Sequence, residues 1–246
     1  MYQVRELTNT IYAFEEGTRV RSFLSVGTEK ALMVDSGNGL VEFEKELPKL
    51  TNLPIILVNS HGDRDHISHN EQFSVRYCHK DDYEKIKATR PIENEEYSFI
   101  GDGDVIDIGG AVYEVIHVPG HTPGSIVLYD RANRIMFAGD TLTSVDTFMF
   151  GVSTDCKMMK GGFEKLMALD LDVDMLLSCH DGCPISNYKD LLHDTYMALC
   201  DYLDGKPETE IFRLTKGAHD KMMKRYVYGC ASILPEVVEE LPALKP

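Results

Sequence analysis

The chain has 246 residues, of which 43% are hydrophobic, and its formal net charge is −15. This composition supports one large buried core. A membrane partner is not expected, because no run approaches the roughly 20 apolar residues of a membrane-spanning helix. The acidic excess repels polyanions over most of the surface, which argues against a nucleic-acid partner. Residues 1–7 are mixed and show no apolar signal region, so we expect a cytoplasmic location.

The first half of the chain alternates strand-like and helix-like segments. Apolar runs typical of strands occur at 11–14, 19–26, 31–35, 53–59 and 75–78. Helical spacing occurs at 40–50, after the break Gly37-Asn38-Gly39, and at 80–88, before an acidic loop at 93–96.

The second half is richer in hairpins. Strands are predicted at 104–108, 112–118, 125–129, 134–138 and 175–179, and helices at 161–168 and 186–203. A basic stretch at 216–225 is typical of a solvated helix face, with a site for an anionic substrate group as the alternative. The pattern alone predicts one domain over 1–246, of α/β or α+β class.

The segment after the apolar run 53–58 reads His61-Gly62-Asp63-Arg64-Asp65-His66. Burying such polar groups costs free energy unless they are paired, and a metal site satisfies all of them together. Alternate side chains of an extended segment point the same way, so His61, Asp63 and Asp65 can converge while His66 joins them at a helix start. The alternative is a capped helix start with surface charges.

Three further candidate ligands follow predicted strands. His121 lies in Pro119-Gly120-His121-Thr122-Pro123-Gly124, Asp140 in Gly139-Asp140-Thr141, and His180 ends the run at 175–179. Strand ends are where sheet proteins commonly carry binding and catalytic residues. Each residue taken singly could be a satisfied histidine or a capping aspartate, but their joint placement favours one metal site.

These motifs, in this order, resemble the metallo-β-lactamase superfamily over about residues 4–190. The resemblance implies a four-layer αβ/βα sandwich that binds two divalent metal ions. It implies a first site formed by His61, Asp63 and His121, and a second formed by Asp65, His66 and His180. Asp140 would bridge the two ions.

One position departs from the family signature, because Asp63 stands where the second histidine is usual. The added carboxylate shifts the preference from zinc towards iron or manganese without excluding zinc, which stays the first expectation. The flavodiiron branch of the superfamily carries a glutamate there, one methylene longer. A third reading is that Asp63 does not bind metal and leaves the first site weak or empty.

The resemblance implies a dinuclear hydrolase in which a hydroxide between the metals attacks a small ester, thioester, lactone or phosphodiester. Asp140 would hold both ions, and Asp65 could orient the nucleophile. The alternatives are a flavodiiron-like oxidoreductase, which would need an external electron donor, and a metal-binding protein without turnover. A small molecule is the expected partner, and a homodimer is the base-rate expectation.

Substrate choice is expected to lie in the loops. The segment 141–154 contains Phe148, Met149 and Phe150, for which core packing and a pocket wall are both open. The segment 211–246 is a candidate C-terminal extension that covers the site.

Overall fold

The computed structural model describes residues 1–17, 20–91, 97–151, 153–180, 182–216 and 219–238. The acidic loop predicted at 93–96 lies outside these ranges. Within them, no helix combines the length and the apolar character that crossing a bilayer requires.

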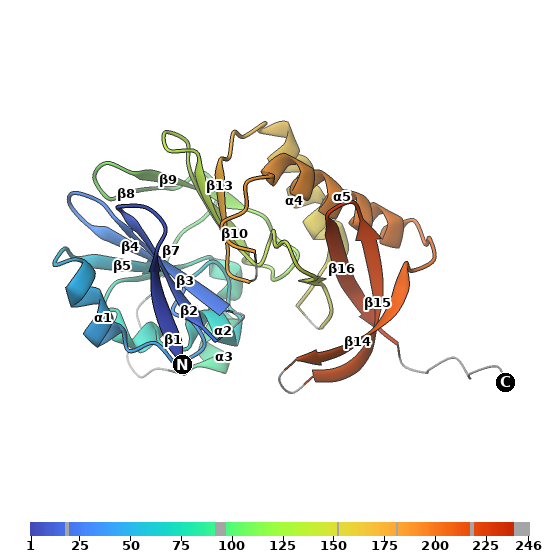
Figure 1. Ribbon diagram of the computed structural model, residues 1–246, viewed down its shortest axis with the longest axis horizontal. Coiled ribbons are helices and arrows are strands. Elements are labelled where there is room, and N and C mark those ends of the chain that lie inside the picture. The colour runs from blue at the N-terminus through green and yellow to red at the C-terminus, as the bar shows by residue number, and fades with distance from the viewer. Residues whose placement is uncertain (18–19, 92–96, 152, 181, 217–218, 239–246) are drawn as a thin grey trace.

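The first sheet has seven strands in chain order (Figure 1). The first four run antiparallel and the rest are parallel to β4. Every residue of β4 is buried, as expected for a strand covered on both faces. The strands are β1 (Tyr2–Glu6), β2 (Ile11–Glu16), β3 (Val20–Val26), β4 (Ala31–Val34), β5 (Ile55–Val58), β6 (Arg76–Cys78) and β7 (Ser98–Phe99).

Helices α1 (Phe43–Leu50), α2 (Arg64–Ile67) and α3 (Tyr83–Thr89) accompany this sheet, with 3₁₀ turns at Asn70–Gln72 and Lys80–Asp82. The first helix begins three residues later than its spacing predicted. The Glu16 carboxylate accepts the backbone N–H groups of Asn38 and Leu40, at 2.9 and 2.8 Å, and these bonds hold the segment before the helix in a loop.

The second sheet has the order β13-β11-β10-β9-β8. It is antiparallel except for the pairing of β11 with β13, which is parallel. Two longer helices accompany it: α4 (Cys156–Ala168) precedes β13 in the chain, and α5 (Tyr188–Leu203) follows it. Its strands are β8 (Val105–Asp107), β9 (Val112–His117), β10 (Ile126–Asp130), β11 (Ile135–Gly139) and β13 (Met175–Ser178).

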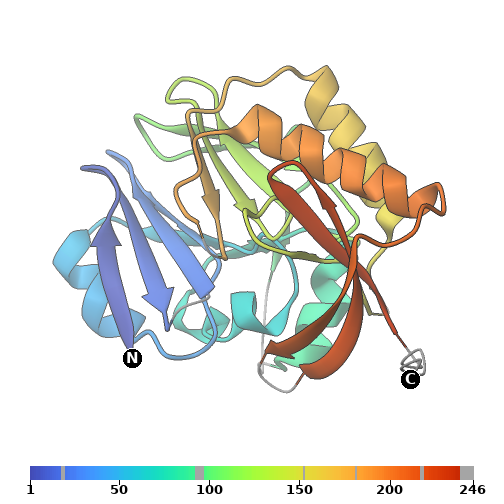
Figure 2. The ribbon, with the colours of Figure 1, turned by 45° about the vertical axis from the view of Figure 1, so that its right-hand side comes forward.

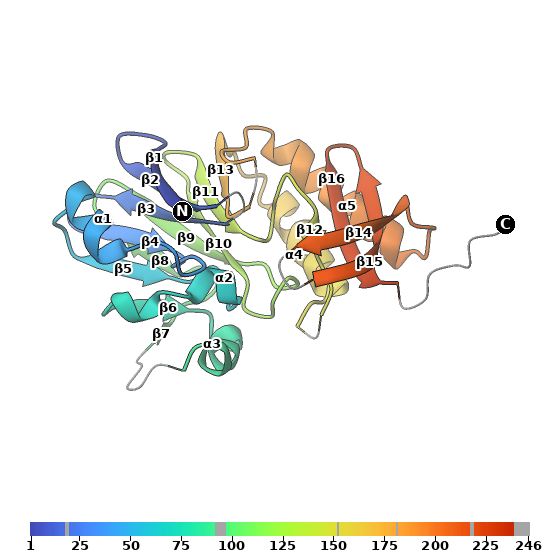
Figure 3. The ribbon, with the colours of Figure 1, turned by 60° about the horizontal axis from the view of Figure 1, so that its bottom comes forward.

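The two sheets pack face to face, and helices cover their outer faces (Figures 1 and 3). Phe23 of β3 meets Phe137 of β11 between the sheets, with ring centroids 5.5 Å apart. Leu24, the next residue, points to the other face and packs in a cluster with Phe43 of α1. The outer face of the second sheet packs against α4 and α5. The predicted four-layer αβ/βα sandwich is therefore confirmed.

A third sheet, here called the C-terminal sheet, has the order β12-β16-β15-β14. Its strands are β12 (Thr147–Phe148), β14 (Glu210–Lys216), β15 (His219–Tyr228) and β16 (Ala231–Val237). In Figure 2 its long red strands lie beside α5. The prediction of a solvated helix face at 216–225 was wrong. Residues 219–225 pair with β14 and most of 223–228 with β16, and such pairing with distant segments leaves no signature in the local sequence pattern.

Candidate metal centre

All seven predicted ligands lie at one edge of the sandwich, just beyond the carboxyl ends of strands. His61 to His66 follow β5, His121 follows β9, Asp140 follows β11 and His180 follows β13. Strands β11 and β13 are parallel, so the residues that follow them emerge side by side. The structure thus brings together groups that are as far apart as 119 residues in the sequence, between His61 and His180.

The first predicted triad, His61, Asp63 and His121, converges on a common point. The ligand atoms of these three side chains lie within 4.8 Å of one another. The Asp63 Oδ2 atom is 3.1 Å from His121 Nε2 and 3.6 Å from His61 Nε2. Asp63 occupies the position before α2 but makes no capping hydrogen bond, so its carboxylate is free to turn towards the two imidazoles.

The second predicted triad, Asp65, His66 and His180, also has its ligand atoms within 4.8 Å of one another. Asp65 Oδ1 is 3.8 Å from His66 Nε2, and Asp65 Oδ2 is 3.9 Å from His180 Nε2. His66 is fully buried on the short helix α2, and Asp65 is partly exposed.

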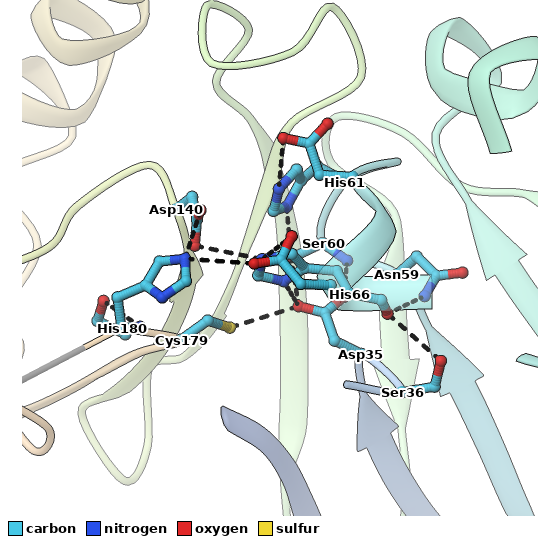
Figure 4. Close-up of polar contacts among 12 residues, drawn as sticks. Asp35, Ser36, Asn59, Ser60, His61, His66, Asp140, Cys179 and His180 are labelled. Carbon is cyan, nitrogen blue, oxygen red and sulfur yellow. Dashed lines mark hydrogen bonds and ion pairs between the residues drawn. The ribbon is translucent and has the colours of Figure 1, made fainter. Parts of the chain in front are cut away.

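Asp140 lies between the two triads. Its Oδ2 atom is 2.9 Å from His180 Nε2 and 3.6 Å from His121 Nε2, and its Oδ1 atom is 3.5 Å from His66 Nε2. Figure 4 shows Asp140 and His180 pointing towards His66. One carboxylate therefore faces histidines of both triads, which is the placement that a bridging ligand needs.

Three buried polar atoms at this centre have no hydrogen-bond partner within the described part of the chain: His61 Nε2, His66 Nε2 and Asp140 Oδ1. Leaving a buried donor or acceptor unsatisfied costs about 1–3 kcal/mol. All three atoms point into the centre and are ligand types that divalent metals accept. The residues present therefore fit a metal-binding group.

The electrostatics also suit cations. Burial acts to raise the pKa of Asp140, but His180 and His66 outweigh it and hold that pKa well below its usual value. Burial acts to lower the pKa of His66, yet Asp140, Asp65 and Asp35 raise it well above its usual value. Asp140 is thus kept ionised, as metal binding requires, and the imidazoles act as its counter-charges.

Asp35, the first residue after β4, is a site residue that the sequence reading missed. It is fully buried, and its Oδ2 atom lies 2.9 Å from His66 Nδ1 and accepts the Ser60 hydroxyl at 2.6 Å. The Ser60 hydroxyl in turn lies 3.0 Å from His61 Nδ1 (Figure 4). One carboxylate thereby orients a histidine of each triad and leaves both Nε2 atoms to face the centre. The available signal was an aspartate directly after an apolar strand.

Asp82 ties the two ligand-bearing loops together and was also missed. The carboxylate is buried and accepts the Gly62 N–H at 2.6 Å, the Thr122 hydroxyl at 2.6 Å and the Gly124 N–H at 2.9 Å. Because these partners neighbour His61 and His121, Asp82 sets the distance between two members of the first triad.

Lys85 of α3 pairs with Asp63, the residue that departs from the family signature. Its ammonium group contacts Asp63 Oδ1, while Oδ2 faces the imidazoles, and it also donates to the Ser153 hydroxyl at 3.0 Å. The two oxygens of Asp63 are thus divided between a lysine and the metal centre. Lys85 offsets the negative charge that Asp63 adds relative to a neutral histidine.

The aromatic segment after Asp140 is largely packed. Met149 is buried in the core beside α4 and α5, and Phe148 and Phe150 pack against Leu214 and its neighbours in the C-terminal sheet. The carbonyl of Phe148 has a further role, since it lies 2.8 Å from His121 Nδ1.

A separate cluster, His79, Asp81 and His117, also brings ligand atoms within 4.8 Å of one another. Its two imidazoles are stacked, however, with centroids 4.0 Å apart and planes 16° apart. Nearly parallel stacked rings direct their in-plane lone pairs side by side instead of at one point. His117 Nε2 also lies 2.8 Å from the Pro123 carbonyl. This cluster is therefore a poorer metal site than the two triads.

Comparison with known proteins places these features in context. The family model described as Metallo-beta-lactamase superfamily matches residues 17–191. The acyl-coenzyme A thioesterase MBLAC2 of Gallus gallus is 28% identical over 165 residues, which cover 52% of this chain and 60% of that protein. The hydroxyacylglutathione hydrolase of Xylella fastidiosa (strain M12) is 30% identical over 164 residues, which cover 67% of this chain and 60% of that protein. The chain thus matches about three fifths of the length of these relatives.

Solved structures share the fold. A metallo-beta-lactamase from Pontibacter korlensis superimposes with a TM-score of 0.66 and 19% identity, covering 82% of this chain and all of that one. The DIM-1 metallo-beta-lactamase gives a TM-score of 0.67 at 14% identity, covering 82% of this chain and 98% of that one. At these identities the likeness concerns the fold alone.

Proposed function

This chain belongs to the metallo-beta-lactamase superfamily, and we propose that it is a metal-dependent hydrolase with two metal ions in the centre described above. Small acyl thioesters are the first substrate class to test, because the relatives are named as hydrolases of acyl-coenzyme A and of hydroxyacylglutathione. Other small esters, lactones and phosphodiesters follow.

The observation that supports this proposal best is the shape of the centre. Two triads share one carboxylate, Asp140, and three inward-facing atoms lack a partner among the described residues. A structural cluster would satisfy these atoms with hydrogen bonds. The side chains of Asp63 and Asp65 are 31% and 34% exposed, so one side of the centre is in contact with solvent, as a site that admits a substrate requires. An enclosed site for binding alone would not need this opening.

The chain's own residues have separate tasks in this proposal. His61, Asp63 and His121 would hold one ion, and Asp65, His66 and His180 the other. Asp140 would face both and keep them in register, while the exposed side of Asp65 could orient the attacking water. Divalent ions bound there would lower the pKa of a coordinated water and polarise the bond to be cleaved.

Metal analysis of the purified chain tests the proposal directly. We expect about two zinc ions per chain, with iron or manganese as alternatives. Dialysis against a chelator should abolish thioester hydrolysis, and returning the metal should restore it. One ion or none per chain, or hydrolysis that survives metal removal, would contradict the dinuclear assignment.

Asp63 gives a sharper test of the first triad. We expect Asp63→His to keep the fold and move the metal preference towards zinc, because it replaces a hard oxygen ligand by an imidazole. Asp63→Ala should weaken one of the two bound ions by more than about 100-fold, since outer partners alone contribute 10–100-fold. Competition with a chromophoric chelator measures both affinities.

Asp174→Ala is the matched control, because it removes a carboxylate that pairs with Arg134 at the opposite end of β13. Its metal affinities should equal those of the parent chain. If Asp63→Ala also binds both ions as tightly as the parent, Asp63 is not a ligand and the first triad has only two members.

Asp63 also favours a second candidate, a flavodiiron-like oxidoreductase, because a third carboxylate makes the ligand set harder and better suited to iron. Two iron ions per chain, together with oxygen or nitric oxide consumption from an added reductant, would support it. Thioester hydrolysis without redox turnover would count against it.

A further inference from the structure

The orientation of His121 depends on a carbonyl from outside its own loop. The Phe148 carbonyl lies 2.8 Å from His121 Nδ1 and accepts that N–H. With Nδ1 held by the carbonyl, Nε2 is turned towards Asp63 and Asp140, at 3.1 and 3.6 Å, and is the nitrogen that a metal ion would take. This pattern, one ring nitrogen held by a carbonyl and the other turned to the metal, is how proteins fix ligating histidines.

That carbonyl belongs to the C-terminal sheet. Phe148 lies in β12, which pairs in parallel with β16 through Thr147 opposite Ile233 and Phe148 opposite Leu234. The Met149 N–H continues the pairing, donating to the Leu234 carbonyl at 3.0 Å. In Figure 3 β12 lies at the side of this sheet. The position of the Phe148 carbonyl is therefore set by β16.

Hydrogen bonds from the C-terminal sheet hold Asp146, the residue just before β12. Asp146 Oδ1 accepts the Arg225 Nε–H and the Ser232 hydroxyl, both at 2.6 Å. Arg225 comes from β15, at the point where the register with β16 shifts, and its other arm contacts Glu210 of β14 at 2.6 Å. The side chains of Asp146 and Arg225 are only 18% and 28% exposed, so this ion pair is partly shielded from water. One arginine thus links β12, β14 and β15.

The C-terminal sheet is itself anchored to the sandwich. Tyr226, Ala231 and Ile233 pack in the same cluster as residues of α4 and α5. Its long strands, 210–237, lie beyond the family match, which ends at residue 191. A segment outside the family match therefore reaches back to a predicted metal ligand.

We propose that the C-terminal sheet positions His121 through β12, and that Arg225 and Asp146 are positioning residues for the first triad. The consequence for metal binding rests on the function proposed above. The consequence for His121 itself does not, because both atoms of the Phe148 contact belong to the chain.

The test compares Arg225→Met with Arg225→Lys in the full chain. We expect Arg225→Met to weaken one of two bound zinc ions by about tenfold, the lower end of the range for outer partners of ligating histidines, and to leave the other unchanged. Nitrogen-15 NMR of the metal-free chain should show the His121 Nδ1–H losing its hydrogen bond to the Phe148 carbonyl. Arg225→Lys, which keeps the charge, should recover part of the zinc affinity and part of the His121 NMR signal.

Lys224→Met is the control. Lys224 lies next to Arg225 in β15, and its ion pair is with Glu236 and not with Asp146. The variant should leave His121 and both zinc affinities unchanged. Asp146→Asn, which keeps the side chain's size, removes the charge of the same ion pair. It should show the same effects on His121 and on zinc affinity, and it replaces Arg225→Met in the test if that variant does not fold.

An unchanged His121 signal in both Arg225→Met and Asp146→Asn would overturn the proposal. So would an equal loss in Lys224→Met, which would show that general weakening of the sheet is the cause. A parent chain that binds no zinc would contradict the proposed function instead, and the NMR comparison would still decide the role of the C-terminal sheet.

Discussion

Asp140→Asn is expected to abolish hydrolysis and to reduce the metal content from two ions per chain to one at most. Asp140 faces His66, His121 and His180 within 3.6 Å, and its Oδ1 atom has no hydrogen-bond partner among the described residues. Asparagine keeps the size but offers one neutral oxygen in place of two charged ones, so it cannot hold two cations together. Losing several kcal/mol of transition-state stabilisation by the metal ions lowers the rate by about 10³-fold.

Elemental analysis and the initial rate of thioester hydrolysis measure this effect. Asp130→Asn is the matched control, because Asp130 is a buried aspartate that ends β10 at the opposite end of the same sheet, where it holds the turn to Asn133. The control is expected to lower the free energy of unfolding but to keep two ions. A fully active Asp140→Asn variant would show that the chemistry occurs elsewhere.

Asp35→Asn is expected to have the next largest effect, although Asp35 is not itself a predicted ligand. The residue has a backbone φ of 60°, which asparagine tolerates well, so the backbone should persist. The amide oxygen can still accept the Ser60 N–H, which lies 2.7 Å from Oδ1. The amide NH₂, however, replaces the oxygen that faces His66 Nδ1 and must donate to it.

A donor at that position cannot accept the His66 Nδ1–H, so the neutral form of His66 would carry its proton on Nε2, the atom that faces the metal centre. A protonated Nε2 cannot bind a metal, and a similar tautomer error in a catalytic triad costs about 10⁴-fold in rate. We expect metal affinity to fall by about 100-fold and hydrolysis to fall in parallel. Nitrogen-15 NMR of His66 checks the tautomer, and chelator competition checks the affinity.

Ser36→Ala is the control for Asp35→Asn. Ser36 is fully buried next to Asp35 and donates to Asn70 Oδ1 at 2.6 Å, but it contacts neither imidazole. Its loss should destabilise folding by about 1–3 kcal/mol without changing the His66 tautomer. If both variants lower metal affinity equally, the effect comes from disturbed packing and not from the tautomer.

The ligand residues and most of the sandwich were predictable because their signals are local. A histidine or aspartate placed directly after an apolar strand is costly to bury, so each of the seven positions was visible within a few residues of sequence. The structure brings all seven together, and their binding of metal stays a prediction. Most predicted strands and helices match the observed ones within a few residues, because alternating and helical spacing are properties of the same short windows.

The partners of those residues depended on the tertiary structure. Asp35 meets His66 across 31 residues, Lys85 meets Asp63 across 22, and Arg225 meets Asp146 across 79. No short window of the kind that reveals a helix or strand contains both members of such a pair. The C-terminal sheet was misread for the same reason, since the basic residues of β15 suit a helix face equally well and only pairing with β14 and β16 excludes it. Local sequence indicates which groups can bind metal, because the cost of burying a polar side chain after an apolar strand is a local property. The fold decided how each group is held, because hydrogen bonds and strand pairing join residues that are distant along the chain.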